Sequence, residues 1–317
     1  MTSKKTSSVQ KINYHILFFI IVLIIFAFAA IKLFLWNKGS SSGYDPEAAP
    51  TEIEAETMDH IQPMVASRLE SGLQDNVTSI LFLGNSPFAD QKEEGGLASA
   101  IADKMDAVPY DGSFAGSFLT TLNKTYQETY KPDGLSLYPV VQAICSQDFS
   151  LVERVAKTVG ETEVNTVNML KEIDYAAIDM LVIMYDLSDY IAGRPLYNPN
   201  EDTDLATWTG SLTASIRLLE ETYPHIRVIF LSPPASGQTI DGFYIDGDKQ
   251  NMGNGTLVDY VNYANNAALA NGISFIDTYY GIISIDKKEE FLRDEYHLNE
   301  KGIQAIADRF YYFFGSE

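Results

Sequence analysis

Residues Leu81–Ser86 read "LFLGNS", an apolar run that stops at Gly-Asn-Ser. Continuous apolar runs bounded by turn residues are typical of strands buried on both faces of a parallel sheet. Ser86, at the end of this run, has two interpretations. It is a helix N-cap, which is the commoner role for serine in such a position. Alternatively, it is a nucleophile at the carboxyl edge of a sheet, where α/β proteins place their sites.

Apolar runs of the same kind recur along the chain and alternate with segments of helical periodicity. This alternation predicts an α/β fold, in which a parallel sheet is covered by helices on both faces. The predicted strands span residues 79–84, 107–112, 179–186, 226–234 and 272–278. The predicted helices span residues 96–105, 116–130, 151–173, 205–223, 256–270 and 300–314.

The N-terminal part of the chain is apolar over a length that suits a membrane. Residues 12–31 carry no formal charge, and the apolar character continues to Trp36. A helix from Tyr14 to Trp36 would rise about 33 Å, roughly one hydrocarbon core. We therefore predict a transmembrane signal anchor at residues 12–36. A signal peptide cleaved at Ala27–Ala29 is the alternative.

The predicted anchor divides the chain into parts. Residues 1–11 form a cytoplasmic N-terminus, residues 37–56 form a small, polar and acidic linker, and residues 57–317 form the globular domain. Every basic residue up to Lys38 precedes the first acidic residue, Asp45. The positive-inside rule then places the globular domain outside the cytoplasm, attached to the cell membrane by a single span.

Composition excludes several classes of partner and cofactor. The net charge is -21, and such an acidic surface repels nucleic acid. Cys145 is the only cysteine, so neither an internal disulfide nor a Cys-rich metal site is expected. The loop at residues 246–255 hints at calcium, but Gln250 and Asn251 break the EF-hand pattern. We therefore expect no metal and no cofactor.

A serine nucleophile needs a base, and the base needs a partner that orients it. Among the 4 histidines, His15 falls in the predicted anchor, His60 is near the linker, and His225 precedes a predicted strand. The fourth, His297, follows the last predicted strand, with Asp294 three residues earlier. A spacing of i and i+3 in a turn allows the carboxylate of Asp294 to accept a hydrogen bond from the ring of His297.

In these motifs the chain resembles the SGNH/GDSL hydrolase family, over residues 78–314. The first block of the family, Gly-Asp-Ser, appears as Gly84–Ser86, with Asn85 in place of aspartate. The glycine of the second block fits Gly116. The third block, Gly-x-Asn-Asp, aligns with Asp186–Asp189, where Asp186 replaces glycine and Ser188 replaces asparagine. The fifth block, Asp-x-x-His, is Asp294–His297.

The resemblance implies a three-layer α/β/α, flavodoxin-like fold and ester hydrolysis. It implies that Ser86 attacks the carbonyl group, that His297 is the base, and that Asp294 orients His297. Its implied oxyanion hole comprises the backbone N–H groups of Ser86 and Gly116 and the side chain of Ser188. Binding roles follow by resemblance for two further residues, Asn85 and Asp189.

The location and the family together suggest an extracytoplasmic serine esterase that acts on an ester-bearing small molecule or on O-acetyl groups of a cell-envelope glycan. Two alternatives stay open. The same triad can transfer an acyl group to a sugar instead of water. The altered third block also suits a domain without activity that binds polysaccharide or a membrane partner.

Overall fold

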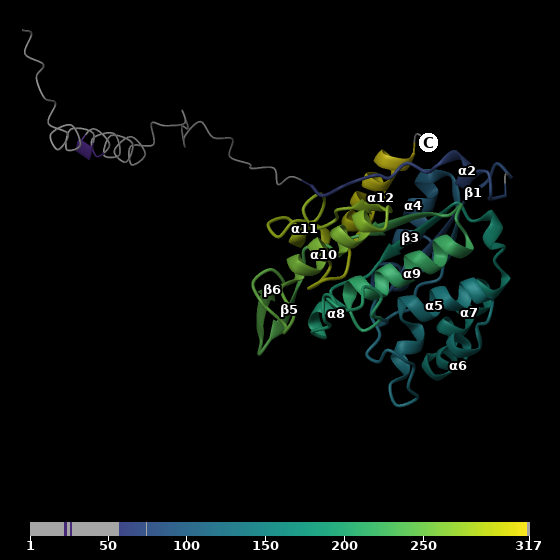
Figure 1. Cartoon of the computed structure of the whole chain (residues 1–317), viewed down its shortest axis with the longest axis horizontal. Coiled ribbons are helices and arrows are strands. Elements are labelled where there is room, and N and C mark those ends of the chain that lie inside the picture. The colour runs from purple at the N-terminus through teal and green to yellow at the C-terminus, as the bar shows by residue number, and fades with distance from the viewer. Residues whose placement is uncertain (1–21, 24–25, 27–56, 74, 316–317) are drawn as a thin grey trace, which may run out of the picture. The chain divides into compact units, whose positions relative to one another are not determined.

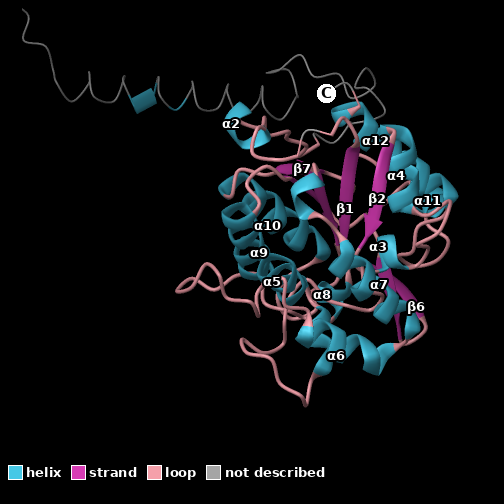
Figure 2. Ribbon diagram, turned by 90° about the vertical axis from the view of Figure 1, so that its right-hand side faces the viewer, coloured by secondary structure: helices cyan, strands magenta, loops and turns pink. Residues whose placement is uncertain are grey.

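The structure, a computed structural model, describes residues 22–23, 26, 57–73 and 75–315. A parallel sheet lies at its centre (Figures 1 and 2). The strand order of this sheet is β2-β1-β3-β4-β7. Along the chain this is the order 2-1-3-4-5 of flavodoxin-like folds, with a reversal between β1 and β3. The strands are β1 Thr78–Gly84, β2 Ala107–Asp111, β3 Met180–Met184, β4 Arg227–Leu231 and β7 Ser274–Ile276. Each predicted strand is present, and the α/β prediction is confirmed.

Helices cover both faces of this sheet. Short helical turns connect or end several of the longer helices. The α-helices are α2 Ala66–Leu69, α3 Ser86–Ala89, α4 Leu97–Met105, α5 Leu137–Ser146, α6 Ser150–Val159, α7 Glu161–Glu172, α8 Ser188–Ile191, α9 Trp208–Thr222, α10 Leu257–Ala270, α11 Lys288–Phe291 and α12 Glu300–Phe314. The 3₁₀ turns are η1 Lys131–Leu135 and η2 Tyr175–Ala177.

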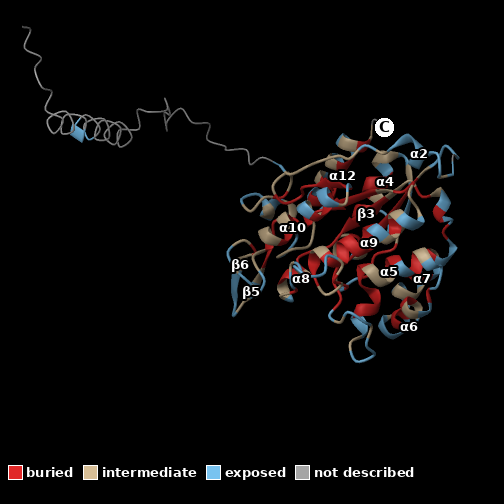
Figure 3. Ribbon diagram, in the orientation of Figure 1, coloured by how far each residue is buried: buried red, intermediate tan, exposed pale blue. Residues whose placement is uncertain are grey.

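Successive residues of the strands point to opposite faces, so the apolar runs build two separate cores. Leu81 and Leu83 of β1 pack in the larger core with residues of α5, α9 and α10. Ile80 and Phe82 of the same strand pack in the smaller core with residues of α4 and α12. The buried sheet between exposed helix surfaces is visible in Figure 3. The continuous apolar character of "ILFL" is therefore explained by burial on both sides.

The helix predicted at residues 116–130 is wrong, because buried carboxylates satisfy the backbone of this segment instead. The N–H groups of Leu119 and Thr120 donate to Asp189, at 2.8 and 3.1 Å. The N–H group of Leu122 donates to Asp133 at 2.6 Å. With these donors bound to side chains distant in sequence, the segment has no need of the i to i−4 bonds of a helix. The helix predicted at 151–173 is present but divided at Gly160 into α6 and α7.

An antiparallel hairpin, β5 Gly237–Ile240 and β6 Phe243–Asp246, was not predicted. Its turn residues, Asp241 and Gly242, have φ values of 52° and 82°. Asp-Gly with positive φ at both positions is a favoured two-residue hairpin turn, so the signal was present in the sequence.

The predicted anchor at residues 12–36 and the linker at residues 37–56 lie outside the described residues, apart from three positions within the anchor. None of the helices that the structure describes is long and apolar enough to cross a membrane.

Gly84 offers a test of how tightly the sheet is packed at its carboxyl edge. A Cβ atom at Gly84 would lie 1.9 Å from the backbone oxygen of Met184 in β3. We expect Gly84→Ala to lower the free energy of unfolding by about 3 kcal/mol or more, because two backbones must separate. The matched control is Gly242→Ala, where φ is +82° and no atom lies within 4 Å of the new Cβ. Its cost should be about 1 kcal/mol of backbone strain. Urea denaturation of the two variants measures both, and equal losses would contradict the packing argument.

Candidate active site

A narrow cleft of about 30 Å³ lies at the carboxyl edge of the sheet, where the strand order reverses. Its lining includes Ser86, which follows β1, and Asp186, which follows β3. Arg293 and His297, from the segment before α12, complete this part of the wall. Residues from three distant parts of the sequence therefore meet at the switch point, as expected for doubly wound sheets.

Ser86 is the first residue of the single helical turn α3, which begins just after β1 ends. The N-cap position belongs to Asn85, and no side chain caps this turn. Pro87 follows Ser86, and a proline without an N–H group suits the first turn of a helix. Within the described part of the chain, the Ser86 hydroxyl has no hydrogen-bond partner, and the residue lines the cleft. The N-cap interpretation of Ser86 does not hold, and its hydroxyl is open to a ligand.

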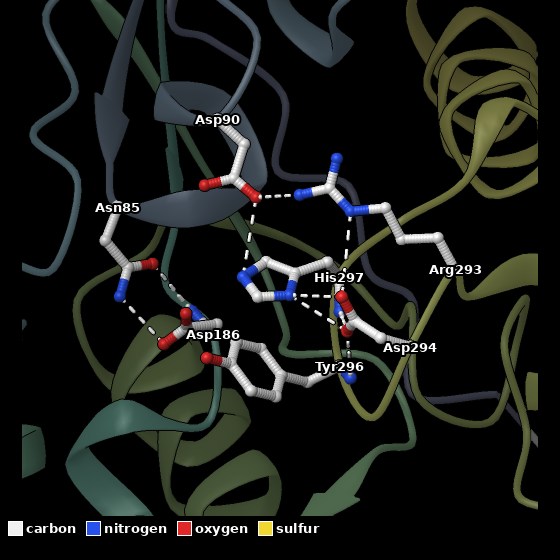
Figure 4. A network of polar contacts seen from close by, with 7 residues as sticks. All are labelled: Asn85, Asp90, Asp186, Arg293, Asp294, Tyr296 and His297. Carbon is white, nitrogen blue, oxygen red and sulfur yellow. Dashed lines mark hydrogen bonds and ion pairs between the residues drawn. The ribbon is translucent and has the colours of Figure 1, made fainter.

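Asp294 and His297 are paired by the tight loop that contains them. The loop is closed by a bridge between Leu292 and Leu298, and Arg293 N donates to the backbone oxygen of His297 at 2.8 Å. Both carboxylate oxygens of Asp294 lie 2.9 Å from His297 Nδ1 (Figure 4). The predicted i, i+3 contact is present, and it leaves Nε2 as the ring nitrogen that faces the cleft.

The loop also fixes the charge of Asp294. Burial alone would raise the pKa of this carboxyl group. Hydrogen bonds from the backbone N–H groups of His297 and Tyr296, and from the His297 ring, outweigh burial and hold the pKa of Asp294 below its ordinary value. Asp294 is therefore ionised at neutral pH and suited to keep a proton on Nδ1.

The expected hydrogen bond between Ser86 and His297 is not formed, although both line one cleft. His297 Nε2 instead lies 3.5 Å from Asp90 Oδ2, at the end of α3. Arg293 donates to the same oxygen of Asp90 at 2.7 Å. Catalytic hydrogen bonds are often long before substrate binds, so this geometry leaves the triad a prediction.

Asp90 and Arg293 were missed by the sequence analysis, although each had a signal. Asp90 is four residues after Ser86, and residues i and i+4 share one face of a helix. Arg293 directly precedes the Asp-x-x-His block. Tyr296 is a third missed neighbour, and its ring centroid lies 4.0 Å from that of His297.

Asn85 and Asp186 form a buried pair that joins the ends of β1 and β3. Asn85 Nδ2 donates to Asp186 Oδ1 at 2.7 Å and to the backbone oxygen of Ser117 at 3.1 Å. The backbone N–H group of Asp186 donates in return to Asn85 Oδ1 at 2.9 Å. Asn85 is 0% exposed, so it cannot contact a ligand, and the binding role implied by resemblance is replaced by a structural one.

Asp189 is also 0% exposed and holds a loop rather than a ligand. Its carboxylate accepts hydrogen bonds from Leu119 and Thr120. Burial raises the pKa of Asp189 to about 6, against the effect of these hydrogen bonds. The binding role implied for Asp189 is therefore also replaced by a structural one.

The other two residues expected in the oxyanion hole are partly accessible. Gly116 is exposed with φ of 67°, and its N–H group makes no hydrogen bond to another described residue. Ser188 is partly buried at the start of α8, and its N–H group donates to Asp186 Oδ1 at 2.8 Å. Its hydroxyl is therefore the only donor that Ser188 can offer to a substrate.

No set of three or more His, Cys, Asp or Glu side chains in the described ranges is arranged to hold a metal ion. No protein-family model and no curated protein matches the sequence.

Solved structures do resemble this one. A protein from Lactobacillus plantarum is 17% identical, with a TM-score of 0.51 over 77% of this chain and 99% of its own. A possible lipase from Chitinophaga pinensis is 12% identical, with a TM-score of 0.50 over 75% of this chain and 98% of its own. A lipase/acylhydrolase from Enterococcus faecalis is 14% identical, with a TM-score of 0.43 over 76% and 96% of the two chains.

At such low identities the likeness concerns the fold alone. The central parallel sheet, its strand order and its likeness to the first two of these structures show a flavodoxin-like α/β fold. The fold implied by the motifs in the sequence is confirmed.

The Asn85–Asp186 pair predicts a specific coupling. Asn85→Asp would bring a second carboxylate against Asp186 in a buried site, and we expect a loss of about 3–5 kcal/mol of unfolding free energy at pH 7. Asp186→Asn alone should cost about 1 kcal/mol, because an amide oxygen can still accept both hydrogen bonds. The double variant should regain part of the loss, since one carboxylate and one amide again face each other.

Urea denaturation at pH 7 gives the coupling energy from this double-mutant cycle. Recovery should be incomplete, because the new carboxylate cannot donate to the backbone oxygen of Ser117. Additive losses would show that the two side chains act independently.

Proposed function

We propose that the chain is a serine esterase that hydrolyses small acyl esters through Ser86, His297 and Asp294. The observation that carries this proposal is the Asp294–His297 pair, which opens onto the same cleft as the unpaired Ser86 hydroxyl. A serine, an imidazole and a carboxylate that orients the imidazole are the three parts that acyl transfer by serine requires.

In the proposed reaction, Ser86 Oγ attacks the ester carbonyl while its proton passes to His297 Nε2. Asp294 keeps the Nδ1 proton in place and stabilises the imidazolium that forms. The backbone N–H groups of Ser86 and Gly116, with the Ser188 hydroxyl, would donate to the developing oxyanion. His297 then returns the proton to the leaving alcohol, and water or a second alcohol releases the acyl group from Ser86.

The small size of the cleft supports esters of short acyl groups as the substrate class. A cavity of about 30 Å³ suits a short acyl group such as acetyl better than a long lipid chain. Together with the predicted extracytoplasmic location, this favours O-acetyl groups on a glycan of the cell envelope. Transfer of the acyl group to a sugar hydroxyl would use the same residues.

One observation favours a second candidate, a domain that binds glycan without catalysis. His297 Nε2 lies near Asp90, and no hydrogen bond joins His297 to Ser86. The two functions differ in whether Ser86 reacts with an electrophile.

Labelling with a fluorophosphonate probe separates the two functions. We expect the wild type to be labelled and to hydrolyse a small acetyl ester, and Ser86→Ala to lose labelling and at least about 10³-fold in turnover. Ser188→Ala should keep labelling and lose less than the roughly 10²–10³-fold typical of an oxyanion donor, because a rotating hydroxyl is a weakly preorganised donor. Absence of both labelling and hydrolysis in the wild type would favour the binding domain.

The proposed location has its own test. Protease added to intact cells should remove residues after Trp36 while leaving a membrane-bound N-terminal fragment, because the positive charges precede the apolar span. An intact domain after treatment would reverse the orientation. A mature chain that starts near Ala30 would instead indicate a cleaved signal peptide.

A further inference from the structure

Arg194 is a buried cation that forms no ion pair with an Asp or Glu among the described residues. The residue is 7% exposed. Its Nη2 atom donates to the hydroxyl of Tyr130 at 3.1 Å, whereas its Nε atom is buried and has no hydrogen-bond partner in the described part of the chain. Burying a charge without a counter-charge is costly, so buried charges are normally paired. Arg194 is therefore a candidate for binding an anion.

The third nitrogen of the guanidinium, Nη1, is the atom that a ligand can reach. It forms no hydrogen bond to another described residue, and unlike Nε it is not fully buried. A guanidinium is planar and always charged, and it presents its N–H groups as a fork that matches the oxygens of a carboxylate or a phosphate. These donors favour an oxyanion over a neutral group.

Two aromatic rings hold the guanidinium in place. Its central carbon lies 4.9 Å from the ring centroid of Phe118 and 5.8 Å from that of Tyr130. The backbone of Arg194 is also fixed. Its N–H group donates to the backbone oxygen of Asp189 at 3.0 Å, and its own oxygen accepts a hydrogen bond from the Tyr260 hydroxyl. A cation that is already held in position loses little conformational freedom when a ligand binds.

The place of Arg194 in the fold links it to the proposed active site. Arg194 lies three residues after α8, the helical turn that follows β3 at the carboxyl edge of the sheet. Phe118, which packs on its guanidinium, lies two residues after Gly116, and two residues of chain span at most about 7 Å. Arg194 therefore contacts the loop of Gly116, where a substrate larger than its ester group would extend.

The acidic composition of the chain does not exclude an anion from this site. The net charge is -21, but at physiological salt exposed charges are screened over about 8 Å. Burial raises the pKa of Asp189, and the charge of Arg194 is among the effects that oppose this rise. Both oxygens of Asp189 already accept hydrogen bonds, from Leu119 and Thr120. Asp189 therefore offsets the charge of Arg194 only in part and from beyond ion-pair distance.

We propose that Arg194 binds an anionic group of the substrate, either a carboxylate or a phosphate. This inference rests on the proposed function and narrows it, because it makes the ester-bearing substrate an acidic glycan rather than a neutral one. Ser86 and His297 would act on the ester, and Arg194 would hold the acidic sugar that carries the ester or lies next to it.

The first test compares three monoacetylated sugars that differ only at carbon 6, derived from glucose, glucuronic acid and glucose 6-phosphate. With the full wild-type chain, KM should be at least about tenfold lower for one or both acidic sugars, because hydrogen bonds to charged groups are the stronger ones. The acidic sugar with the lower KM identifies the anion as a carboxylate or a phosphate. Equal KM values for all three sugars would overturn the inference.

Variants of Arg194 separate a binding role from a structural one. Arg194→Gln should remove the preference, raising KM for the preferred acidic sugar about tenfold relative to the neutral sugar. Arg194→Lys should keep part of the preference, because an ammonium retains the charge but not the fork. It also carries the test if Arg194→Gln does not fold, which thermal unfolding reveals. An equal change on all three sugars in both variants would mean that Arg194 only supports its loop, and the inference would fail.

The matched control is Arg217→Gln. Arg217 is 54% exposed and lies 2.8 Å from Asp202, so this variant removes the same charge from an exposed ion pair. The KM values of the three sugars should equal those of the wild type. A loss of the preference in this variant would show that the overall charge, and not Arg194, selects the anion.

Binding without catalysis gives a readout that does not need Ser86 to react. Saturation-transfer NMR of the Ser86→Ala chain with glucuronate or glucose 6-phosphate should show binding of the preferred acid, and adding Arg194→Gln should abolish it. If binding depends on Arg194 but the wild type hydrolyses no acetyl ester, the esterase proposal fails and the anion site stands. If the esters are hydrolysed but neither acid binds, the anion site fails and the esterase proposal stands.

Discussion

The candidate site depends on the close approach of β1 and β3 at their carboxyl ends. Gly84 has no side chain, and the backbone oxygen of Met184 occupies the space that a Cβ atom would need. At this distance Asn85 and Asp186 exchange hydrogen bonds, each burying a polar group that would otherwise lack a partner. With Asn85 turned inward, the next residue, Ser86, begins the helical turn that lines the cleft. The position of Ser86 thus follows from backbone packing and from its buried neighbour Asn85.

This constraint also explains two departures from the family motif as one feature. The family has an acidic residue before the serine and a glycine in the third block, whereas this chain has Asn85 and Asp186. In this chain the carboxylate stands at the end of β3, as Asp186, and not at the end of β1. The amide of Asn85, at the end of β1, donates to this carboxylate. Asp186 also accepts from the backbone N–H group of Ser188, which fixes the start of α8. Asn85 and Asp186 therefore join the ends of the two strands in this chain.

The sequence predicted those features that depend on residues close to one another along the chain. The central strands β1, β3 and β4 are apolar at successive positions because both of their faces are buried. Asp294 meets His297 because the two residues are three positions apart in a tight loop. The segment at 116–130 was wrongly predicted as a helix. Its backbone N–H groups donate to the side chains of Asp133 and Asp189, and the periodicity of apolar residues within the segment cannot reveal these acceptors. The spacing of Asp90 from Ser86 was visible in the sequence, but its approach to His297 joins two distant segments and was not.

The charges of the cleft oppose what an oxyanion requires. Asp186 and Asp90 line it, Asp294 lies behind His297, and Arg293 is already engaged with Asp90. Negative charge that develops on a carbonyl oxygen in the cleft is repelled by these carboxylates. Hydrogen-bond donors must lie close enough to the oxygen to outweigh this repulsion. Backbone N–H groups meet that demand, because they are fixed and carry no counter-charge, whereas the Ser188 hydroxyl must first be oriented. If the proposed function holds, an oxyanion in this cleft would therefore rely on backbone donors such as the N–H group of Ser86, which lines it, more than on a side-chain donor.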